Sequence, residues 1–257
     1  MPGAVKGFSH RGSDMSRENT AAAFQAVAQL GFRYFETDLR TTLDGKLVCF
    51  HDSVLDRVTD RRGPISKYTW DELKDVRVGG EPILLFEELL ATFPDHHVNV
   101  DLKDSASSQY LGRLIRRYDA AERVLVGSFQ DNHRINFFRS FPRYRNVMAS
   151  SGGQRCLTML WSVSRLGVNA ATLAVGKRMR KQLLIDAAQV PVYEKVVRVT
   201  DRRFIEFCHA LGIEVHVWTI NDPATMEQLI DLGVDGLVSD DGPALAGVLD
   251  RHGFWPQ

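Results

Sequence analysis

A short junction of leucine, glycine and a further apolar residue recurs four times along the chain and limits the folds it can adopt. In each copy the glycine can take the left-handed conformation that ends a helix, and apolar residues suited to a strand follow it. A chain that alternates helices and strands in this way favours a parallel sheet. The four junctions are Leu30-Gly31-Phe32, Leu166-Gly167-Val168, Leu211-Gly212-Ile213 and Leu232-Gly233-Val234.

Eight segments are predicted to be strands, and eight parallel strands suit a closed α/β barrel, the (β/α)8 TIM barrel. The length of 257 residues fits one such domain, since these barrels typically run to about 250 residues. An open doubly wound sheet is the alternative, although no glycine-rich G-x-G-x-x-G fingerprint supports it. Residues 175–200 are hard to assign and could hold another short strand. The predicted strands are residues 4–9, 33–39, 98–103, 124–128, 146–149, 169–174, 214–219 and 236–239.

Charge and apolar content exclude several classes of function. Lys+Arg and Asp+Glu both total 32, so no overall field attracts nucleic acid, and any attraction to phosphate must be local. No run of about 18 consecutive apolar residues is present, and no basic stretch followed by a long apolar one opens the chain. We therefore expect a cytoplasmic protein with no integral membrane segment. The three cysteines lack C-x-x-C spacing, which argues against a disulfide framework or a zinc site.

Two pairs of charged residues stand two positions apart in predicted strands. Glu36 and Asp38 form the first pair, and Asp101 and Lys103 form the second. A strand has a period of two, so each pair lies on one face, and the carboxyl ends of parallel barrel strands meet at the active-site face. Neighbouring carboxylates repel each other and are relieved by a cation or a shared proton. A hard divalent ion, Mg²⁺ or Ca²⁺, is the simplest solution.

Two histidines also follow predicted strands. His10 precedes an arginine and a glycine that allow a sharp turn, and His51 ends a short apolar segment. Cleavage of a phosphodiester requires an activated nucleophile and a protonated leaving group, and histidine suits both tasks near neutral pH. One histidine can act as the base and the other as the acid. His216 alternates with Trp218 on a predicted strand, so it is either a further site residue or a packed bystander.

Arg11 and Lys103 add positive charge to the same set. Phosphoryl transfer is catalysed largely by positioning and charge neutralisation, and the planar fork of arginine matches phosphate oxygens. We expect Arg11 to hold a non-bridging oxygen and Lys103 to stabilise charge as it develops. The alternative for either residue is an ion pair at the rim of the barrel. The whole set of histidines, carboxylates and cations favours a phosphodiester hydrolase.

The order of these motifs resembles that of the glycerophosphodiester phosphodiesterase family. The most specific part of the resemblance covers residues 7–60, and residues 216–221 and 233–240 are similar to the family's closing strands. The middle of the chain is less similar. The motifs of the first part are His10-Arg11-Gly12, Glu18-Asn19-Thr20, Glu36-Thr37-Asp38, Asp44-Gly45 and His51-Asp52.

The resemblance implies a TIM-barrel phosphodiesterase that depends on one bound divalent cation, Mg²⁺ or Ca²⁺. Its small-molecule substrates would be glycerophosphodiesters, cleaved to glycerol 3-phosphate and an alcohol such as choline or ethanolamine. It also implies roles for the residues at matching positions. These are His10 and His51 as the acid-base pair, Glu36, Asp38 and Asp101 as metal ligands, Arg11 and Lys103 as phosphate contacts, and Trp218 as a wall of the substrate site.

Two positions depart from the family pattern. Arg17 stands where the family usually has proline before Glu-Asn-Thr, and Asp101 stands where the third metal ligand is usually glutamate. Aspartate is one methylene shorter, so Asp101 would reach a metal through water or need its strand to lie closer. Two rival functions stay open. One is a lysophospholipase D or related phosphodiesterase on the same scaffold, which needs an apolar acyl groove, and the other is a non-catalytic phosphate-binding barrel.

Residues 54–82 are too many for an ordinary connection. We expect them to form a small subdomain inserted into a single barrel domain of residues 1–257. Thr69 and Glu72 have the spacing of a capping box that opens a short helix. The insert is expected either to shape the pocket for the group esterified to phosphate or only to pack beside the barrel.

Overall fold

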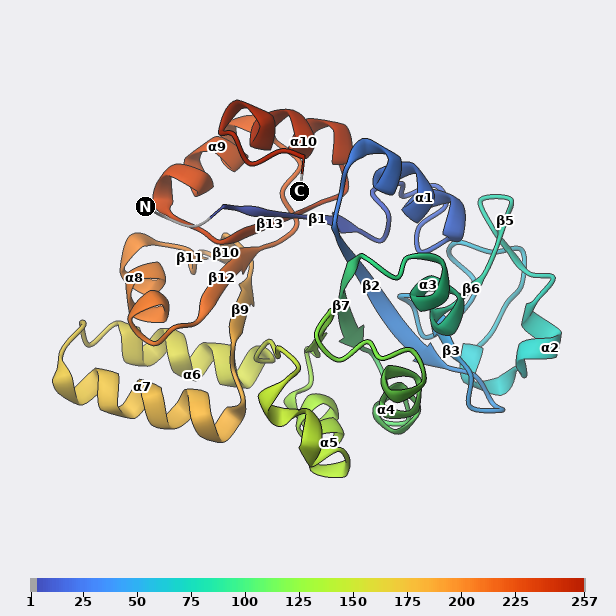
Figure 1. Ribbon diagram of the computed structural model, residues 1–257, viewed down its shortest axis with the longest axis horizontal. Helices are drawn as coiled ribbons and strands as arrows, with labels where there is room; N and C mark the ends of the chain where they lie inside the picture. Colours follow the sequence, from blue (N-terminus) through green and yellow to red (C-terminus); the bar gives the residue numbers. More distant parts are fainter. Residues whose placement is uncertain (1–3, 257) are drawn as a thin grey trace.

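Parallel strands alternate with helices along the computed structural model, which describes residues 4–256 (Figure 1). Strand β1 (Lys6–His10) pairs in parallel with β2 (Tyr34–Thr41) on one side and with β13 (Gly236–Ser239) on the other. Figure 1 shows the strands curling around one centre, with most of the helices arranged outside them. The predicted α/β class is confirmed. The first three residues, which entered the expectation for the start of the chain, lie outside the described part.

The sheet continues in parallel on both sides of these three strands. Beyond β2 come β7 and then β8, and beyond β13 come β12 and then β9. The bounds are β7 (His97–Leu102), β8 (Val124–Gly127), β12 (Glu214–Val217) and β9 (Ala187–Val190).

Single bridges occupy the space between β8 and β9. Ser150 forms a parallel bridge with Val126, and Ser151 forms one with Ala187. The Ser151 amide donates to the Val126 carbonyl at 3.0 Å, and the Ala187 amide donates to the Ser150 carbonyl at 3.1 Å. A two-residue segment therefore contacts the free edges of both strands.

An antiparallel extension leaves the sheet at β2. Strand β3 (Leu47–Cys49) pairs with the end of β2, and β6 (Leu84–Leu85) pairs with β3. The chain between β3 and β6 buries apolar residues in a cluster separate from the main core. The Glu72 carboxylate accepts a hydrogen bond from the Thr69 amide at 2.8 Å, so the predicted capping box is confirmed. The short elements here are η1 (Ile65–Lys67), α2 (Trp70–Leu73), β4 (Arg77–Val78) and β5 (Glu81–Pro82).

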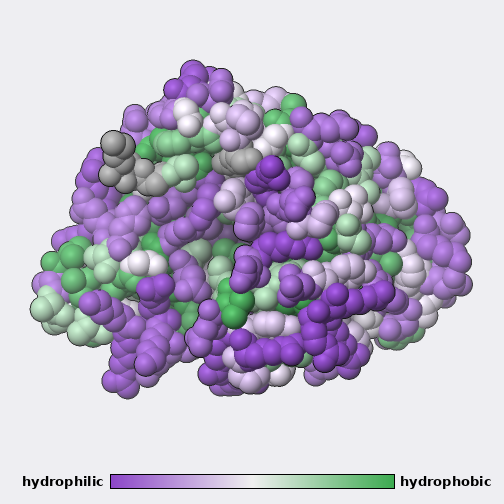
Figure 2. All heavy atoms as spheres, in the orientation of Figure 1, coloured by the Kyte–Doolittle hydropathy of each residue, from purple (hydrophilic) through white to green (hydrophobic). Residues whose placement is uncertain are grey.

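Helices between the strands bury their apolar faces in the main core. No helix within residues 4–256 is long and apolar enough to cross a membrane. Figure 2 shows a largely hydrophilic surface in this view. The remaining elements are α1 (Ala21–Leu30), α3 (Phe86–Thr92), α4 (Ser107–Arg117), α5 (Asp131–Ser140), η2 (Pro142–Asn146), α6 (Gln154–Ser164), α7 (Ala170–Leu183), the hairpin of β10 (Tyr193–Glu194) and β11 (Val197–Arg198), α8 (Arg202–Ala210), α9 (Pro223–Leu232) and α10 (Gly242–Arg251).

Three of the four glycine junctions end a helix and lead into a strand, as predicted. Gly31 (φ 105°) ends α1 before β2, and Gly233 (φ 98°) ends α9 before β13. Gly212 (φ 68°) lies between α8 and β12. The junction at Gly167 differs, because it connects α6 to another helix, α7.

The predicted strand at residues 169–174 is wrong, because a helix begins there. The Asn169 side chain accepts hydrogen bonds from the amides of Ala171 and Thr172 and so caps α7. An asparagine at this position satisfies backbone donors that a strand would have used in its ladder. The strand of this region is β9, inside the unassigned residues 175–200.

The predicted strand at residues 146–149 is also wrong. Helix η2 ends at Asn146, and Met148 still donates its amide to the Tyr144 carbonyl at 2.9 Å. The first bridge to β8 is at Ser150, although the Ala149 carbonyl already accepts a hydrogen bond from the Val126 amide at 3.0 Å. Of the apolar residues that suggested a strand, Met148 is buried at 2% exposure, whereas Val147 is 48% exposed.

A fully buried arginine, Arg134, joins three separate parts of the fold. Arg134 of α5 is 0% exposed. Its Nη1 donates to the Ser150 hydroxyl at 3.0 Å and to the carbonyls of Leu183 and Leu184 at 2.6 and 2.9 Å. Its Nη2 donates to Asp131 at 3.2 Å. The bridge segment, the end of α7 and the start of α5 are thus held by one side chain.

We expect Arg134→Met to lower the free energy of unfolding by about 3 to 5 kcal/mol, since it leaves the carbonyls of Leu183 and Leu184 without their side-chain donor and the Asp131 carboxylate without its cation. Urea unfolding followed by circular dichroism measures the change. Arg139→Met on the exposed side of the same helix is the matched control and should shift stability by less than about 0.5 kcal/mol. Equal effects from the two substitutions would contradict this account.

Candidate active site

One cavity of about 580 Å³ lies at the carboxyl ends of the parallel strands. All eight residues that the sequence predicts for the site line it. They are His10, Arg11, Glu36, Asp38, His51, Asp101, Lys103 and Trp218.

Strand register explains why the charged residues meet. His10 stands opposite Glu36 in the β1–β2 pair, and Asp38 stands opposite Asp101 in the β2–β7 pair. Glu36 and Asp38 lie two positions apart, so both side chains leave the same face of β2. The parallel ladder therefore brings three carboxylates and a histidine to one end of the sheet.

Asp38 is the most heavily paired carboxylate of the site. Its Oδ1 lies 2.9 Å from Lys103 Nζ, and its Oδ2 lies 2.9 Å from Arg11 Nε. Asn19 Nδ2 also donates to Oδ2 at 3.3 Å. Burial alone would raise the pKa of Asp38, but the adjacent Lys103 and Arg11 lower it below the ordinary value. Asp38 is therefore ionised and holds both cations in place.

Glu36 and Asp101 are less well compensated. Burial first, and then the charge of Asp38, raise the pKa of Glu36 to about 7. Its Oε2 is buried without a hydrogen-bond partner among the described residues, with His10 Nε2 at 3.7 Å. Asp101 pairs through Oδ2 with Lys103 Nζ at 2.6 Å, while its Oδ1 has no hydrogen-bond partner in the described part of the chain.

The donor set suits a hard divalent cation. Glu36 and Asp101 each offer one buried, unpartnered carboxylate oxygen to the cavity, and Asn99 adds an unpartnered amide oxygen. Oxygen ligands of this kind are those that Mg²⁺ and Ca²⁺ take. Within residues 4–256, however, no three His, Cys, Asp or Glu side chains are already grouped as a metal site. Asp38 instead pairs with Lys103 and Arg11.

His10 is fixed by a carboxylate on its far nitrogen. His10 Nδ1 lies 2.5 Å from Asp240 Oδ1. Asn221 Nδ2 donates to the other oxygen of Asp240 at 2.9 Å and so fixes that carboxylate. Burial lowers the pKa of His10, but Glu36 and Asp240 raise it further, and the net effect is an increase.

His51 has a similar arrangement from a different part of the chain. Its Nδ1 lies 2.6 Å from Asp52 Oδ1, and Arg57 Nε donates to Asp52 Oδ2 at 2.6 Å. Because Nδ1 of each histidine is engaged by a carboxylate, Nε2 is the nitrogen left for proton exchange with a substrate. The cavity thus holds two oriented imidazoles.

Sequence reasoning missed several contacts of the site. Asn99 lies two positions before Asp101 on β7, so the strand period that identifies Asp101 also points to Asn99. Asn19 lies in a recognised motif, but only the structure shows its hydrogen bond to Asp38. Asp240 is 230 positions from His10, and no local pattern connects the two.

His216 is a packed residue and does not line the cavity. It is 1% exposed, its ring lies 4.9 Å from that of Phe8, and its Nε2 lies 3.0 Å from Glu214. It precedes Trp218 by two positions, but its ring is buried and Trp218 alone of the two lines the cavity.

The remaining walls of the cavity are mainly apolar and come from the opposite half of the sheet. Phe129 follows β8 and packs edge-on against Trp218 with ring centroids 5.5 Å apart. Lys103 Nζ lies 5.4 Å from the Phe129 ring, where the charged and apolar halves meet. No residue of the predicted insert, 54–82, lines this cavity in the described chain, so the expectation that the insert walls the pocket is not supported. The other apolar residues are Leu157, Trp161, Val190, Pro191, Val196, Val197 and Val199.

Comparisons with known proteins agree with this geometry. The sequence model of the glycerophosphoryl diester phosphodiesterase family matches residues 10–242. A probable glycerophosphodiester phosphodiesterase 2 of Mycobacterium tuberculosis is 35% identical over 252 residues, which cover 96% of this chain and 92% of that protein. Two solved structures share the fold at 21% identity. A glycerophosphodiester phosphodiesterase of Agrobacterium tumefaciens has a TM-score of 0.78 with coverage of 96% and 99%, and an Oleispira antarctica phosphodiesterase in complex with the product sn-glycerol-3-phosphate has a TM-score of 0.77 with coverage of 95% and 96%.

Proposed function

The chain belongs to the glycerophosphoryl diester phosphodiesterase family and is a phosphoric diester hydrolase. We propose that it cleaves small glycerophosphodiesters to glycerol 3-phosphate and an alcohol. The observation that carries the proposal is the meeting of two oriented histidines, three carboxylates and two cations in one cavity. The product bound to the Oleispira antarctica phosphodiesterase supports glycerol 3-phosphate as the product here. Because the chain is a phosphoric diester hydrolase, the alternative of a non-catalytic phosphate-binding barrel is excluded.

In this proposal the two histidines exchange protons with the substrate. We assign His10 as the general acid that protonates the alkoxide of the departing alcohol, with its Nδ1 held by Asp240. His51 is the general base and takes a proton from the attacking nucleophile. Asp240 and Asp52 hold the two rings through Nδ1. A positioned acid and base each lower the barrier where the proton moves.

In this proposal Arg11 and Lys103 neutralise part of the negative charge of the phosphate. A divalent cation, which the family generally uses, neutralises the rest. Glu36, Asp38 and Asp101 would hold one Mg²⁺ or Ca²⁺, which supplies charge neutralisation at the phosphate oxygens. Arg11 and Lys103 contact the same phosphate. Their shared partner Asp38 sets their positions before the substrate arrives.

We also propose that the sheet closes into a barrel. The bridges at Ser150 and Ser151 support closure of the sheet into the predicted (β/α)8 barrel, with this segment as the fifth strand position between β8 and β9. A single barrel domain with residues 54–82 as its insert is supported by the separate apolar cluster of that segment. Its role in substrate choice is not supported by the cavity lining.

The direct test is release of glycerol 3-phosphate from glycerophosphocholine by the purified protein, with Mg²⁺, with Ca²⁺ and after removal of divalent ions. We expect release that requires one of the two ions. Failure to release glycerol 3-phosphate from any of several glycerophosphodiesters would overturn the proposal.

The apolar half of the cavity favours a second candidate, a lysophospholipase D. The acyl groove that this activity needs has a counterpart in the walls formed by α6 and the β10–β11 hairpin. Leu157 and Trp161 contribute from α6, and Val196 and Val197 contribute from the hairpin. Val196 is 93% exposed at the hairpin turn, so a hydrocarbon chain placed along this wall would cover apolar surface that water now contacts.

If the second candidate is correct, kcat/KM should rise with acyl length along butanoyl, hexanoyl and octanoyl lysophosphatidylcholines, by up to about fourfold for each methylene that the wall covers. These short chains stay monomeric, so micelles do not complicate the comparison. Val196→Asp should flatten the dependence. The matched control Leu166→Asp changes an exposed leucine outside the cavity and should keep it. A kcat/KM independent of chain length would exclude this candidate and leave the first intact.

A further inference from the structure

We propose that Arg57 is a positioning residue of this active site, which holds His51 and Arg11 in place from outside the cavity through two carboxylates. The proposal rests on the proposed function, because it assigns Arg57 to the support of the base and of a phosphate contact. Arg57 lies in the segment predicted as an insert and does not line the catalytic cavity in the described chain. Its role would therefore be mechanical and electrostatic, without contact to the substrate.

The guanidinium of Arg57 divides its donors between Asp52 and Glu18. Nε donates to Asp52 Oδ2 at 2.6 Å. Nη1 and Nη2 donate to the two oxygens of Glu18 at 3.0 and 2.7 Å, which is a bidentate pair. Such a fork restricts both the position and the plane of a carboxylate. Glu18 is 3% exposed, so little water replaces this partner if it is lost.

Each carboxylate passes the restraint to a different site residue. Asp52 contacts Nδ1 of His51 at 2.6 Å, which fixes the imidazole orientation. Glu18 contacts Arg11 Nη1 at 3.3 Å, on the side of the guanidinium away from the Nε contact with Asp38. Without Arg57 the buried Glu18 would keep Arg11 as its main cation, and the stronger pull would draw Arg11 away from Asp38. One arginine thus supports two separate parts of the reaction.

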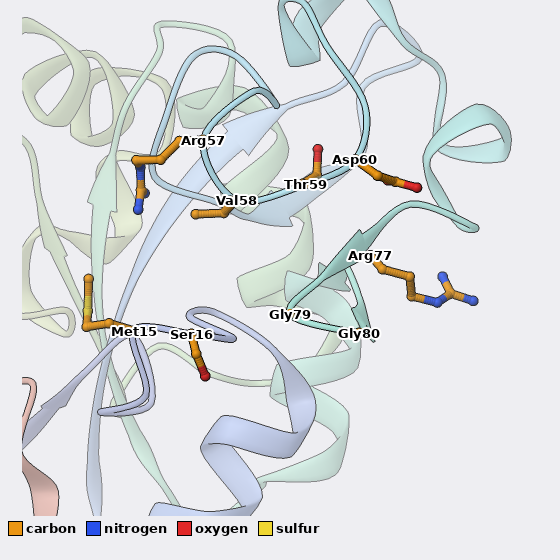
Figure 3. Close-up of a pocket in the computed structure, with 9 residues that line it drawn as sticks. All are labelled: Met15, Ser16, Arg57, Val58, Thr59, Asp60, Arg77, Gly79 and Gly80. Carbon is orange, nitrogen blue, oxygen red and sulfur yellow. The ribbon is translucent and has the colours of Figure 1, made fainter.

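Arg57 can be reached from a second cleft that is separate from the catalytic cavity. Its side chain is 44% exposed. Figure 3 shows Arg57 on the same side of this cleft as Met15, whereas Arg77 points away from both. The cleft, of about 610 Å³, is lined by Met15, Ser16, Arg57, Val58, Thr59, Asp60, Arg77, Gly79 and Gly80. A small cation from solvent can therefore enter the position of the guanidinium if the side chain is removed.

The test is Arg57→Ala assayed on glycerophosphocholine with and without added guanidinium chloride. We expect kcat to fall about tenfold to hundredfold, the usual cost of removing a residue that orients a catalytic group. KM should rise as well, because the loss of Arg57 displaces Arg11, which contacts the substrate phosphate. Millimolar guanidinium should restore part of kcat in a saturable way, whereas sodium chloride at equal ionic strength should not. Arg57→Lys should fall between the alanine variant and wild type, since lysine keeps the charge but loses the fork.

Arg77→Ala is the matched control. Arg77 lines the same cleft, and within residues 4–256 its guanidinium donates to the nearby carbonyls of Lys74 and Val76, so its loss should leave kcat unchanged. A folded Arg57→Ala protein with wild-type kcat, or one that loses kcat without guanidinium rescue, would overturn the inference. If the alanine variant does not fold, Arg57→Lys carries the test, and a wild-type kcat there would count against the bidentate restraint. An inactive wild-type protein would instead count against the proposed function.

Discussion

His10→Ala and His51→Ala should each lower kcat on glycerophosphocholine by about 10² to 10⁴, the usual contribution of a positioned proton-transfer group. Both histidines lie at strand ends beside the cavity and are not core residues. The variants should therefore keep the circular dichroism spectrum of the wild type. His97→Ala is the control, because His97 lies at the opposite end of β7 and does not line the cavity.

Leaving-group chemistry separates the two histidines. An activated aryl phosphodiester needs less protonation of its departing oxygen than glycerophosphocholine does, so it should partly rescue the variant that lacks the acid. We expect this rescue for His10→Ala and not for His51→Ala. The reverse pattern would exchange the two roles, and near-wild-type turnover by either variant would contradict the acid-base pair.

Removal of divalent ions should abolish activity, and Mg²⁺ or Ca²⁺ should restore it. Without a cation, the buried oxygens of Glu36 and Asp101 have no partner in the described chain and the negative charge of the site is only partly balanced. Glu36→Gln, Asp38→Asn and Asp101→Asn should each raise the ion concentration needed for half-maximal activity. Asp95→Asn removes an exposed carboxylate just before β7 and should not. Full activity after exhaustive chelation, with no metal detected by elemental analysis, would exclude this role.

The same ion should bind more weakly in acid. The pKa of Glu36 is raised to about 7 in the absence of a cation, so below that pH a proton occupies the carboxylate and competes with the metal. Apparent affinity should fall by about tenfold for each pH unit below 7 and level off above it. Calorimetric titrations across this range measure the slope and the proton released. An affinity independent of pH would show that Glu36 is not a ligand.

The sequence predicted which charged residues line one cavity, for a physical reason. Glu36, Asp38 and Asp101 lie on strands, and a period of two fixes which side chains share a face without knowledge of the rest of the fold. The two carboxylates that orient the histidines differ in how far along the sequence they lie from them. Asp52 adjoins His51 in the chain, whereas Asp240 reaches His10 only because β13 pairs with β1. Contacts of that second kind depend on which distant strands pair in the sheet and leave no local signal.

The middle of the chain was predicted poorly because local signals there conflict with tertiary structure. The junction at Gly167 has the same leucine, glycine and apolar pattern as the others, but Asn169 two positions later caps a helix. Strand β9 is only four residues long and the β10–β11 hairpin follows within a few residues, so neither has a long periodic pattern. Yet this region supplies α6 and the hairpin, which form the apolar walls of the cavity.

The separation of the cavity into a charged half on β1, β2 and β7 and an apolar half beyond β8, β9 and β12 has an evolutionary consequence. If the proposed function holds, mutations that reshape α6 or the hairpin would alter which organic group is accommodated, while the hydrogen bonds around His10, His51 and Asp38 would stay in place. A lineage could then change its substrate range through intermediates that keep turnover. The same separation allows a laboratory library to randomise the hairpin and select for new esters on an unchanged catalytic background.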